Sequence, residues 1–481
     1  MEELSGLDAS FLYLETPKIP MHIGSVSIIE GSLQFDDFRQ FIQDRLHTVA
    51  KLTQKLVTVP LSLDRPYWVD DPDFDLSLHL HRTALPGSGD WKELRYLASH
   101  VFSQPLNRDR PLWEFIFVEG LDSIPQVPKG SVALICKVHH AGFDGKSGAD
   151  LMSMLYDISP EPRSVPAPVP KVIKEIPSSV SLITKSAYNF VTRPGKLPGL
   201  LWDTGKSTLK AGYLTRSQGV TPTLPFRAPK TRFNDTVAAE RIWNSAILDI
   251  NRVKILRKAV TDATLNDVIL AICAGALRRY LLEKDELPDK PLVAMVPVST
   301  RTAEGKNAMG NQVSAMYVQL ATDLADPIKR LEKIHHNTVV GKLYQDAVDA
   351  KSLMGYAELI PFGLASVAAR LYTRAAIAKR HRPFFNVVIT NVPGPQIPVY
   401  MAGHKLIVNM GTAPIFDGMG LIMPICSYNG TISISPTSAV NLMPDLDNFT
   451  RYIRESANEL EKAVQQKMHE TAVIKNFLEQ D

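Results

Sequence analysis

The chain has 481 residues, enough for two or three domains with buried cores, and its 45% hydrophobic and 21% charged residues are typical of globular proteins. Its 53 basic and 50 acidic residues give a net charge of only +3 without a long basic block, which argues against nucleic acid as a partner. Three scattered cysteines argue against a disulfide framework or a zinc ribbon, and the acidic N-terminus and the lack of a long apolar run argue against secretion or membrane insertion, so we expect a cytoplasmic protein.

The first pattern that carries chemistry is the stretch His139-His140-Ala141-Gly142-Phe143-Asp144-Gly145. Residues 131–138 are apolar and β-branched, which predicts a buried strand, and residues 146–158 carry apolar side chains at helical spacing. The two histidines therefore end a strand and precede a turn and a helix. If the strand continues through them, their imidazoles project to opposite faces, so that one can face a reaction centre while the other is held by packing and hydrogen bonds.

Two other interpretations of this stretch compete with catalysis. A metal site is disfavoured, because neighbouring histidines on a strand do not easily bind one ion from the same side. A buried histidine pair before an ordinary Asp-Gly turn stays open when the stretch is taken alone.

The clearest break in composition follows the helix predicted at residues 146–158. Residues 159–170 contain five prolines, which forbid a continued helix or a central strand and predict an extended connector. Little periodicity follows as far as Pro229. We therefore divide the chain into an N-terminal half (1–158), a proline-rich crossover (159–230) and a C-terminal half (231–481).

The C-terminal half mixes strands and helices in the same way as the first. The pattern predicts strands near 241–248, 292–298, 311–320 and 386–392, a helix from about Asn251, a helix from an N-cap at Asn266 to Tyr280, and an amphipathic helix from Leu446. This alternation predicts an α/β (α+β) protein.

Six blocks stand in a fixed order along the chain: 4–15 with Pro20-Met21-His22-Ile23-Gly24, then Arg110-Pro111-Leu112-Trp113-Glu114, His139 to Gly145, Asn266-Asp267-Val268, Gly310-Asn311-Gln312, and Thr390-Asn391-Val392-Pro393-Gly394-Pro395. Over nearly the full chain they resemble the bacterial wax ester synthase/acyl-CoA:diacylglycerol acyltransferases. The His-His-x-x-x-Asp-Gly motif is complete, and it links this family to chloramphenicol acetyltransferase, carnitine acyltransferases and condensation domains. Family members often carry a basic residue at the position of Thr53, so the cation that pairs with Asp144 stays open.

The resemblance implies two halves similar to chloramphenicol acetyltransferase, each with a mostly antiparallel or mixed sheet and helices, that meet at a substrate tunnel. It implies that acyl-CoA enters from one side, that the acceptor enters from the other, and that His140 lies where they meet. Acyl-CoA would be a substrate, and neither a cofactor nor a metal is expected.

An alcohol that attacks a thioester needs a base within hydrogen-bond reach, and His140 is our candidate. We expect His139 to order the site from the other side of the strand. We interpret Asp144 as a structural residue that holds the loop or pairs with Arg110.

Other motif residues have weaker roles. The candidate donors to a tetrahedral intermediate are Asn266, Thr390, Asn391 and the backbone N–H groups near Gly145. The Asn266-Asp267 pair is equally explained by helix capping, and the Pro111-Leu112-Trp113 segment either lines the tunnel or belongs to the core. No chemical role follows from the sequence for His22 or Asp8.

We therefore expect a fatty acyltransferase that acts on a long-chain alcohol or on diacylglycerol. The alternatives are transfer to another lipid acceptor and a non-catalytic protein that binds lipid inclusions, although the latter needs neither His140 nor Asp144. Such substrates lie at a membrane or lipid-inclusion surface, and residues 364–382 combine apolar helical spacing with basic residues. An ordinary surface helix explains that segment equally well. The sequence does not define the oligomeric state.

Overall fold

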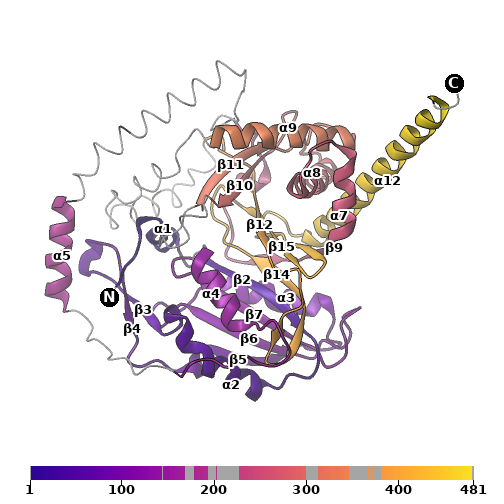
Figure 1. The fold of residues 1–481 in the computed structure, drawn as a ribbon. Coiled ribbons are helices and arrows are strands. Elements are labelled where there is room, and N and C mark those ends of the chain that lie inside the picture. The colour runs from indigo at the N-terminus through magenta and orange to yellow at the C-terminus, as the bar shows by residue number, and fades with distance from the viewer. Residues whose placement is uncertain are drawn as a thin grey trace.

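The computed structural model describes residues 2–143, 145–167, 178–192, 227–299, 313–345 and 381–478, together with the single residues 202, 367 and 371. Two mixed β-sheets carry the fold. In Figure 1 the indigo and magenta strands of the first sheet lie below the orange and yellow strands of the second, and helices cover both. The predicted fold class, α/β with mixed sheets in both parts of the chain, is confirmed.

The first sheet has the strand order β13-β14-β2-β7-β6-β5, and all its pairs are antiparallel except β5 with β6. Its central strand β7 is buried along its whole length. Side chains of β7 alternate as predicted, since Ala133 and Ile135 pack in one core cluster while Leu134, Cys136 and Val138 pack in another. The strands are β2 His22–Ile29, β5 Leu80–Ala84, β6 Trp113–Glu119, β7 Val132–His139, β13 Tyr400–Met401 and β14 His404–Thr412. The helices of this part of the chain are α1 Gly6–Leu14, α2 Phe35–Arg45, α3 Trp91–Ser103, α4 Gly145–Leu155 and α5 Ser179–Thr192.

The second sheet has the order β11-β10-β12-β15-β16-β9, and β17 joins β15 to β8. Helix α8 is buried nearly all round, since its surface is covered by α7, α9 and α12. The strands are β8 Arg241–Trp243, β9 Ala246–Asp249, β10 Val293–Ser299, β11 Val313–Gln319, β12 Val387–Pro393, β15 Leu421–Tyr428, β16 Thr431–Ile434 and β17 Thr437–Ala439. The helices are α7 Ile250–Leu256, α8 Leu265–Glu283, α9 Pro327–Gln345 and α12 Leu446–Leu478.

Smaller elements complete the described residues. A three-stranded sheet consists of β1 Glu2–Glu3, β3 Gln54–Val57 and β4 Tyr67–Asp70, with β4 in the middle. Short 3₁₀ helices are η1 Leu46–Thr48, η2 Ala50–Leu52, η3 Pro60–Ser62, η4 Leu76–Leu78, η6 Arg232–Asn234 and η7 Arg257–Ala259. Among the described helices, none has the length and apolar composition needed to cross a bilayer.

Strand β14 belongs to the first sheet and lies beside strands of the second. It comes from the predicted C-terminal half, but it pairs with β2 in the first sheet. Side chains of the second sheet hold its other edge, because the Tyr428 hydroxyl donates to the Leu406 carbonyl at 2.9 Å and the Ser433 hydroxyl donates to the Asn409 carbonyl at 2.7 Å. The first sheet is thus built from both ends of the chain. The boundaries at 158 and 231 stay a prediction.

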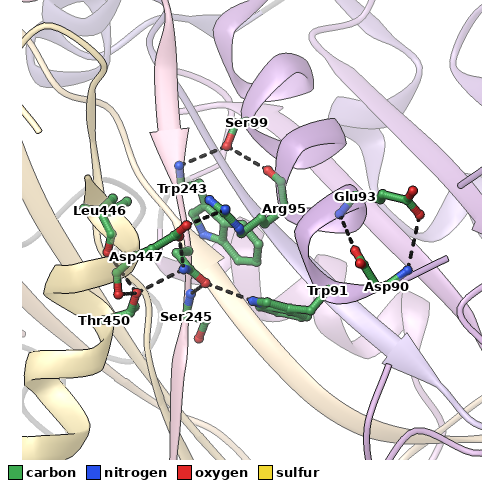
Figure 2. Close-up of polar contacts among 11 residues, drawn as sticks. Asp90, Trp91, Glu93, Arg95, Ser99, Trp243, Ser245, Leu446, Asp447 and Thr450 are labelled. Atoms are coloured by element: carbon green, nitrogen blue, oxygen red, sulfur yellow. Dashed lines mark hydrogen bonds and ion pairs between the residues drawn. The ribbon is translucent and has the colours of Figure 1, made fainter. Parts of the chain in front are cut away.

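A polar network joins α3, the end of β8 and the start of α12 (Figure 2). The indole N–H of Trp91 donates to the Asn244 side-chain oxygen at 3.0 Å. The Asn244 amide donates in turn to Asp447 at 2.9 Å and to the Thr450 hydroxyl at 3.0 Å. Asn244 is buried, and both its side-chain oxygen and its side-chain nitrogen are hydrogen-bonded. It therefore fixes three elements relative to one another.

Two local predictions in the C-terminal half are wrong. The strand predicted near 241–248 is two strands, because Asn244 and Ser245 turn out of the sheet to join the network of Figure 2. The N-cap of α8 is Thr264, not Asn266. The Thr264 hydroxyl accepts the Asp267 N–H at 3.2 Å, and the Asp267 carboxylate accepts the Thr264 N–H at 2.8 Å, a reciprocal capping box that leaves Asn266 inside the first turn.

Candidate active site

The two histidines lie at the end of β7, where their backbones bond to residues of two other sequence blocks, 110–114 and 20–24. The His139 N–H donates to the Leu112 carbonyl at 2.9 Å, and the His140 N–H donates to the Met21 carbonyl at 2.9 Å. His139 is the last residue of the strand and is 0% exposed. His140 is the first residue beyond it and remains partly exposed.

Of the two ring nitrogens of His139, Nδ1 is hydrogen-bonded and Nε2 faces a carboxylate. Its Nδ1 accepts the Ala141 backbone N–H at 3.0 Å, so the proton of the neutral ring belongs on Nε2. Nε2 lies 3.4 Å from Glu15 Oε1, a distance typical of a loose polar contact. His139 thus closes the turn that follows His140, and its ring is buried.

Glu15 is the carboxylate behind His139. Its Oε2 accepts from Arg108 Nε at 2.7 Å and also from Arg108 Nη2, and its Oε1 accepts the Met21 N–H at 3.2 Å. Burial by itself would raise the pKa of Glu15, but the nearby His139 and the Arg108 guanidinium outweigh it and lower that pKa from 4.5 to about 2. The carboxylate is therefore ionised at every physiological pH.

This pKa predicts how Glu15 contributes to stability. Since its folded-state pKa is depressed, its contribution is complete above pH 4.5 and is lost as the pH falls toward 2. A pKa lowered from 4.5 to about 2 corresponds to about 3 kcal/mol. We expect Glu15→Gln to lower the free energy of unfolding by an amount that is constant at neutral pH and shrinks in acid, as measured by denaturant titrations over this range. A difference between the two proteins that does not change with pH would contradict it.

Helix α1 brings a second residue to the histidines. Phe11 stacks on the imidazole of His140 with ring centroids 3.9 Å apart and an angle of 9° between the planes. Phe11 and Glu15 are four residues apart and so lie on the same side of α1. The helix begins at Ser5, whose hydroxyl accepts the Asp8 N–H at 3.1 Å. The Ser5 hydroxyl also donates to the Asp8 carboxylate at 2.6 Å, so the Asp8 side chain helps to hold the first turn, a role that the sequence did not indicate.

The turn after the histidines packs against Trp68. A β-carbon on Gly142 would lie 3.0 Å from the Trp68 indole, so a glycine lets the turn approach that ring. Phe143 is buried, and Gly145 is the first residue of α4. Asp144 lies outside the described residues, so its structural role stays a prediction. Arg110, its proposed partner, donates to the Leu78 carbonyl at 2.9 Å.

Of the Pro111-Leu112-Trp113 segment, Trp113 is a core residue. It is 0% exposed, its indole N–H donates to the Leu52 carbonyl at 2.9 Å, and it stacks on His79 with ring centroids 4.5 Å apart. Leu112 packs with α1 and Trp68, and Pro111 is also buried. The segment holds the end of β7 through its backbone. A role in lining a tunnel stays a prediction.

The Asn266-Asp267 pair begins α8. The Asp267 carboxylate, beyond its place in the capping box, accepts from the Thr338 hydroxyl at 2.6 Å and contacts His335 Nδ1 at 3.0 Å, both on α9. Burial by itself would raise the pKa of Asp267, but these hydrogen bonds outweigh it, and the pKa lies below its ordinary value. Asn266 is partly exposed. The geometry of Asp267 is that of a residue that joins two helices.

Thr390 and Asn391 lie near the end of β12, where both are partly exposed. The turn that follows is closed by a hydrogen bond from the Gly394 N–H to the Ser427 carbonyl at 2.9 Å, and a β-carbon at Gly394 would come within 2.4 Å of that carbonyl oxygen. The role of Thr390 and Asn391 as donors to a tetrahedral intermediate stays a prediction. The Gly310-Asn311-Gln312 block lies outside the described residues.

Sequence reasoning missed three residues of this site: Phe11, Glu15 and Arg108. Phe11 and Glu15 belong to the opening block 4–15, and their spacing of four was the available signal. Nothing in the local pattern shows that this helix lies over the end of β7. Within the described ranges, no three His, Cys, Asp or Glu side chains come together in a way that could hold a metal ion.

Comparisons with known proteins find relatives that match nearly the whole chain. The model of the wax ester synthase/diacylglycerol acyltransferase catalytic domain matches residues 4–269, and that of the WS/DGAT C-terminal domain matches residues 309–461. A protein of Mycobacterium tuberculosis (strain CDC 1551 / Oshkosh), named as a diacylglycerol O-acyltransferase, is 33% identical over 464 residues, which cover 95% of this chain and 90% of that protein.

Two solved structures show the same fold. The wax ester synthase/diacylglycerol acyltransferase from Marinobacter aquaeolei VT8 is 27% identical with a TM-score of 0.69, over 97% of this chain and 100% of that one. The starter condensation domain of rhizomide synthetase shares the fold at 13% identity and a TM-score of 0.55, over 96% of this chain and 94% of that one. With both domain models matched in order and one third of the residues identical over nearly its full length, the chain belongs to the wax ester synthase/diacylglycerol acyltransferase family.

Proposed function

We propose that this protein transfers a fatty acyl group from acyl-CoA to the hydroxyl of a long-chain alcohol or of diacylglycerol, with His140 as the general base. The observation that carries the proposal is the difference in burial and contacts between the two histidines. His139 is fully buried, with Nδ1 hydrogen-bonded and Nε2 facing Glu15, whereas His140 is partly exposed and its ring stacks on Phe11. His140 is therefore the histidine of the pair that a substrate can reach.

The reaction needs one base that acts twice. The neutral imidazole of His140 takes the proton of the acceptor hydroxyl as its oxygen attacks the thioester carbonyl carbon. The tetrahedral intermediate then collapses, the carbon–sulfur bond breaks, and the imidazolium returns its proton to the departing thiolate. The products are an ester and free CoA. No acyl-enzyme is required, because the thioester is already activated, and stacking on Phe11 keeps the ring in one orientation through both steps.

Release of free thiol from palmitoyl-CoA tests this proposal. Hexadecanol and dioleoylglycerol should each be offered as acceptor, with a no-acceptor control, and the ester should be identified by chromatography. Thiol release that depends on either acceptor, with the matching ester formed, supports the proposal. Binding of acyl-CoA without turnover would favour a lipid-binding protein, and turnover with another lipid alone would change the acceptor class.

We propose further that the reaction uses neither a metal nor a cofactor, because a positioned histidine supplies the proton transfer that the chemistry requires. A chelator such as EDTA should then leave the rate of acyl transfer unchanged, and elemental analysis should find no stoichiometric zinc. Activity that is lost on chelation and restored by a divalent ion would contradict this prediction.

We also propose that the protein attaches peripherally to a membrane or lipid-inclusion surface through residues 364–382, since both substrates are poorly soluble. Of the apolar residues in this segment, Val367 and Leu371 are described, and they are 54% and 56% exposed. Their spacing of four places them on one face if the segment is helical, and Arg370, Arg374, Lys379, Arg380 and Arg382 supply positive charge in the sequence.

Replacing Val367 and Leu371 together by aspartate should weaken binding to vesicles of phosphatidylcholine and phosphatidylglycerol, measured by co-flotation. The double variant should keep its melting temperature, because both side chains are exposed. The matched control is Tyr96→Asp, which changes a residue that is 77% exposed on α3. Equal flotation of wild type and double variant would place the lipid contact elsewhere.

A further inference from the structure

The residues behind His139 form a chain of contacts that ends at the turn carrying His140. We propose that Glu15 is a positioning residue for acyl transfer: held by Arg108, its carboxylate keeps the proton of His139 on Nε2, so that His139 Nδ1 can hold the Ala141 N–H and fix the backbone at His140. This inference rests on the proposed function of His140 and adds to it a way in which His140 is positioned.

The geometry supplies each link. Arg108 donates two hydrogen bonds to Glu15 and a third, at 2.9 Å, to the Leu12 carbonyl of α1. Glu15 Oε1 lies 3.4 Å from His139 Nε2, and His139 Nδ1 accepts the Ala141 N–H at 3.0 Å. Ala141 is the residue after His140, so a change in this last bond moves the base directly.

The tautomer of His139 decides whether the last link exists. A proton on Nδ1 would point at the Ala141 N–H, and two donors cannot bond to each other. A carboxylate beside Nε2 favours the tautomer that carries its proton there, because an N–H donates well to a charged acceptor. With Glu15 removed, only the Ala141 N–H would still favour this tautomer, so the preference would weaken and the turn would be held less firmly.

The other charged groups around His139 do not replace Glu15. His22 lies directly opposite on β2, and burial together with the nearby charge of Lys137 holds its pKa well below the ordinary range, so it stays neutral. Lys137 on β7 is buried and bonds to Glu114 at 2.9 Å. Arg241 donates to backbone carbonyls, among them that of Lys18. Within the described residues, the carboxylate at His139 Nε2 is therefore that of Glu15.

The first test compares kcat and KM of Glu15→Ala with wild type. We expect kcat to fall about 100-fold, as for a reacting group that is displaced by about 1 Å, while KM for acyl-CoA changes little. Glu15→Gln should recover much of the loss, because its amide oxygen still accepts from Nε2–H. The matched control is Glu119→Ala, which removes the bidentate ion pair between Glu119 on β6 and Arg82 on β5 and should leave kcat unchanged.

The second test does not depend on activity. Nuclear magnetic resonance of protein labelled with ¹⁵N-histidine distinguishes the two neutral tautomers, and His139→Gln identifies the signal of His139. We expect a protonated Nε2 and an unprotonated Nδ1 in wild type and in Glu15→Gln, and a mixture in Glu15→Ala.

The outcomes separate this inference from the proposed function. Wild-type kcat in Glu15→Ala, or an unchanged tautomer in that variant, overturns the positioning role even if acyl transfer is confirmed. If Glu15→Ala does not fold, Glu15→Gln decides: a loss of about 100-fold in kcat with the tautomer retained would assign the effect to charge and overturn the proposal. An inactive wild type with the expected tautomer change would overturn the proposed function alone.

Discussion

Replacing His140 by alanine should lower kcat for acyl transfer by about a hundredfold to ten-thousandfold, because it removes the group that we propose takes the proton of the attacking hydroxyl. The fold should survive, since His140 lies at the end of β7, is only partly buried and holds its place through a backbone hydrogen bond to Met21 that alanine keeps. Thermal unfolding followed by circular dichroism, together with the thiol-release assay, measures both quantities on one preparation.

Two companion variants sharpen this test. His139→Ala should lose less activity than His140→Ala and more thermal stability, because it removes a fully buried ring and the acceptor of the Ala141 N–H. His100→Ala changes an exposed histidine on α3 and should leave both quantities unchanged. A His140→Ala protein that keeps half of the wild-type rate would remove His140 from the mechanism.

The part of the site that could be predicted from sequence is the part encoded locally. The apolar run before His139 indicated a buried strand, and the strand ends at that residue, followed by a turn and by α4 as expected. The alternation of side chains along β7 follows from the geometry of any strand, so it needed no knowledge of the fold. The assignment of the two histidines to different tasks rests on this alternation.

The remaining part depends on contacts between distant segments. Phe11 and Glu15 reach the histidines because α1 lies over the end of β7, and β14 completes the first sheet although it follows most of the second in the chain. Neither arrangement leaves a periodic signal in the sequence. The N-cap of α8 could not be predicted for a different reason. Both Thr264 and Asn266 are good capping residues. Thr264 is the N-cap because Asp267, three residues later, completes a capping box with it.

Because the first sheet is built from both ends of the chain, the contact between the two sheets should matter for stability, and Trp243 lies in this contact. It is 0% exposed, its indole N–H donates to the Gly411 carbonyl of β14 at 3.0 Å, and its backbone N–H donates to the Ser99 hydroxyl of α3 at 3.0 Å (Figure 2). Its ring packs between Phe102 and Trp91.

Trp243→Ala should therefore lower the free energy of unfolding by about 3–5 kcal/mol, the usual range for a buried tryptophan replaced by alanine. Trp243→Phe keeps most of the apolar contact and leaves the Gly411 carbonyl without its donor, so part of the loss, about 1–3 kcal/mol, should remain. Equilibrium unfolding in guanidinium chloride measures each variant, and Tyr96→Ala on α3, whose side chain is 77% exposed, should lie within about 0.5 kcal/mol of wild type. If Trp243→Ala unfolds at the wild-type midpoint with the same slope, the contact between the two sheets does not depend on this residue.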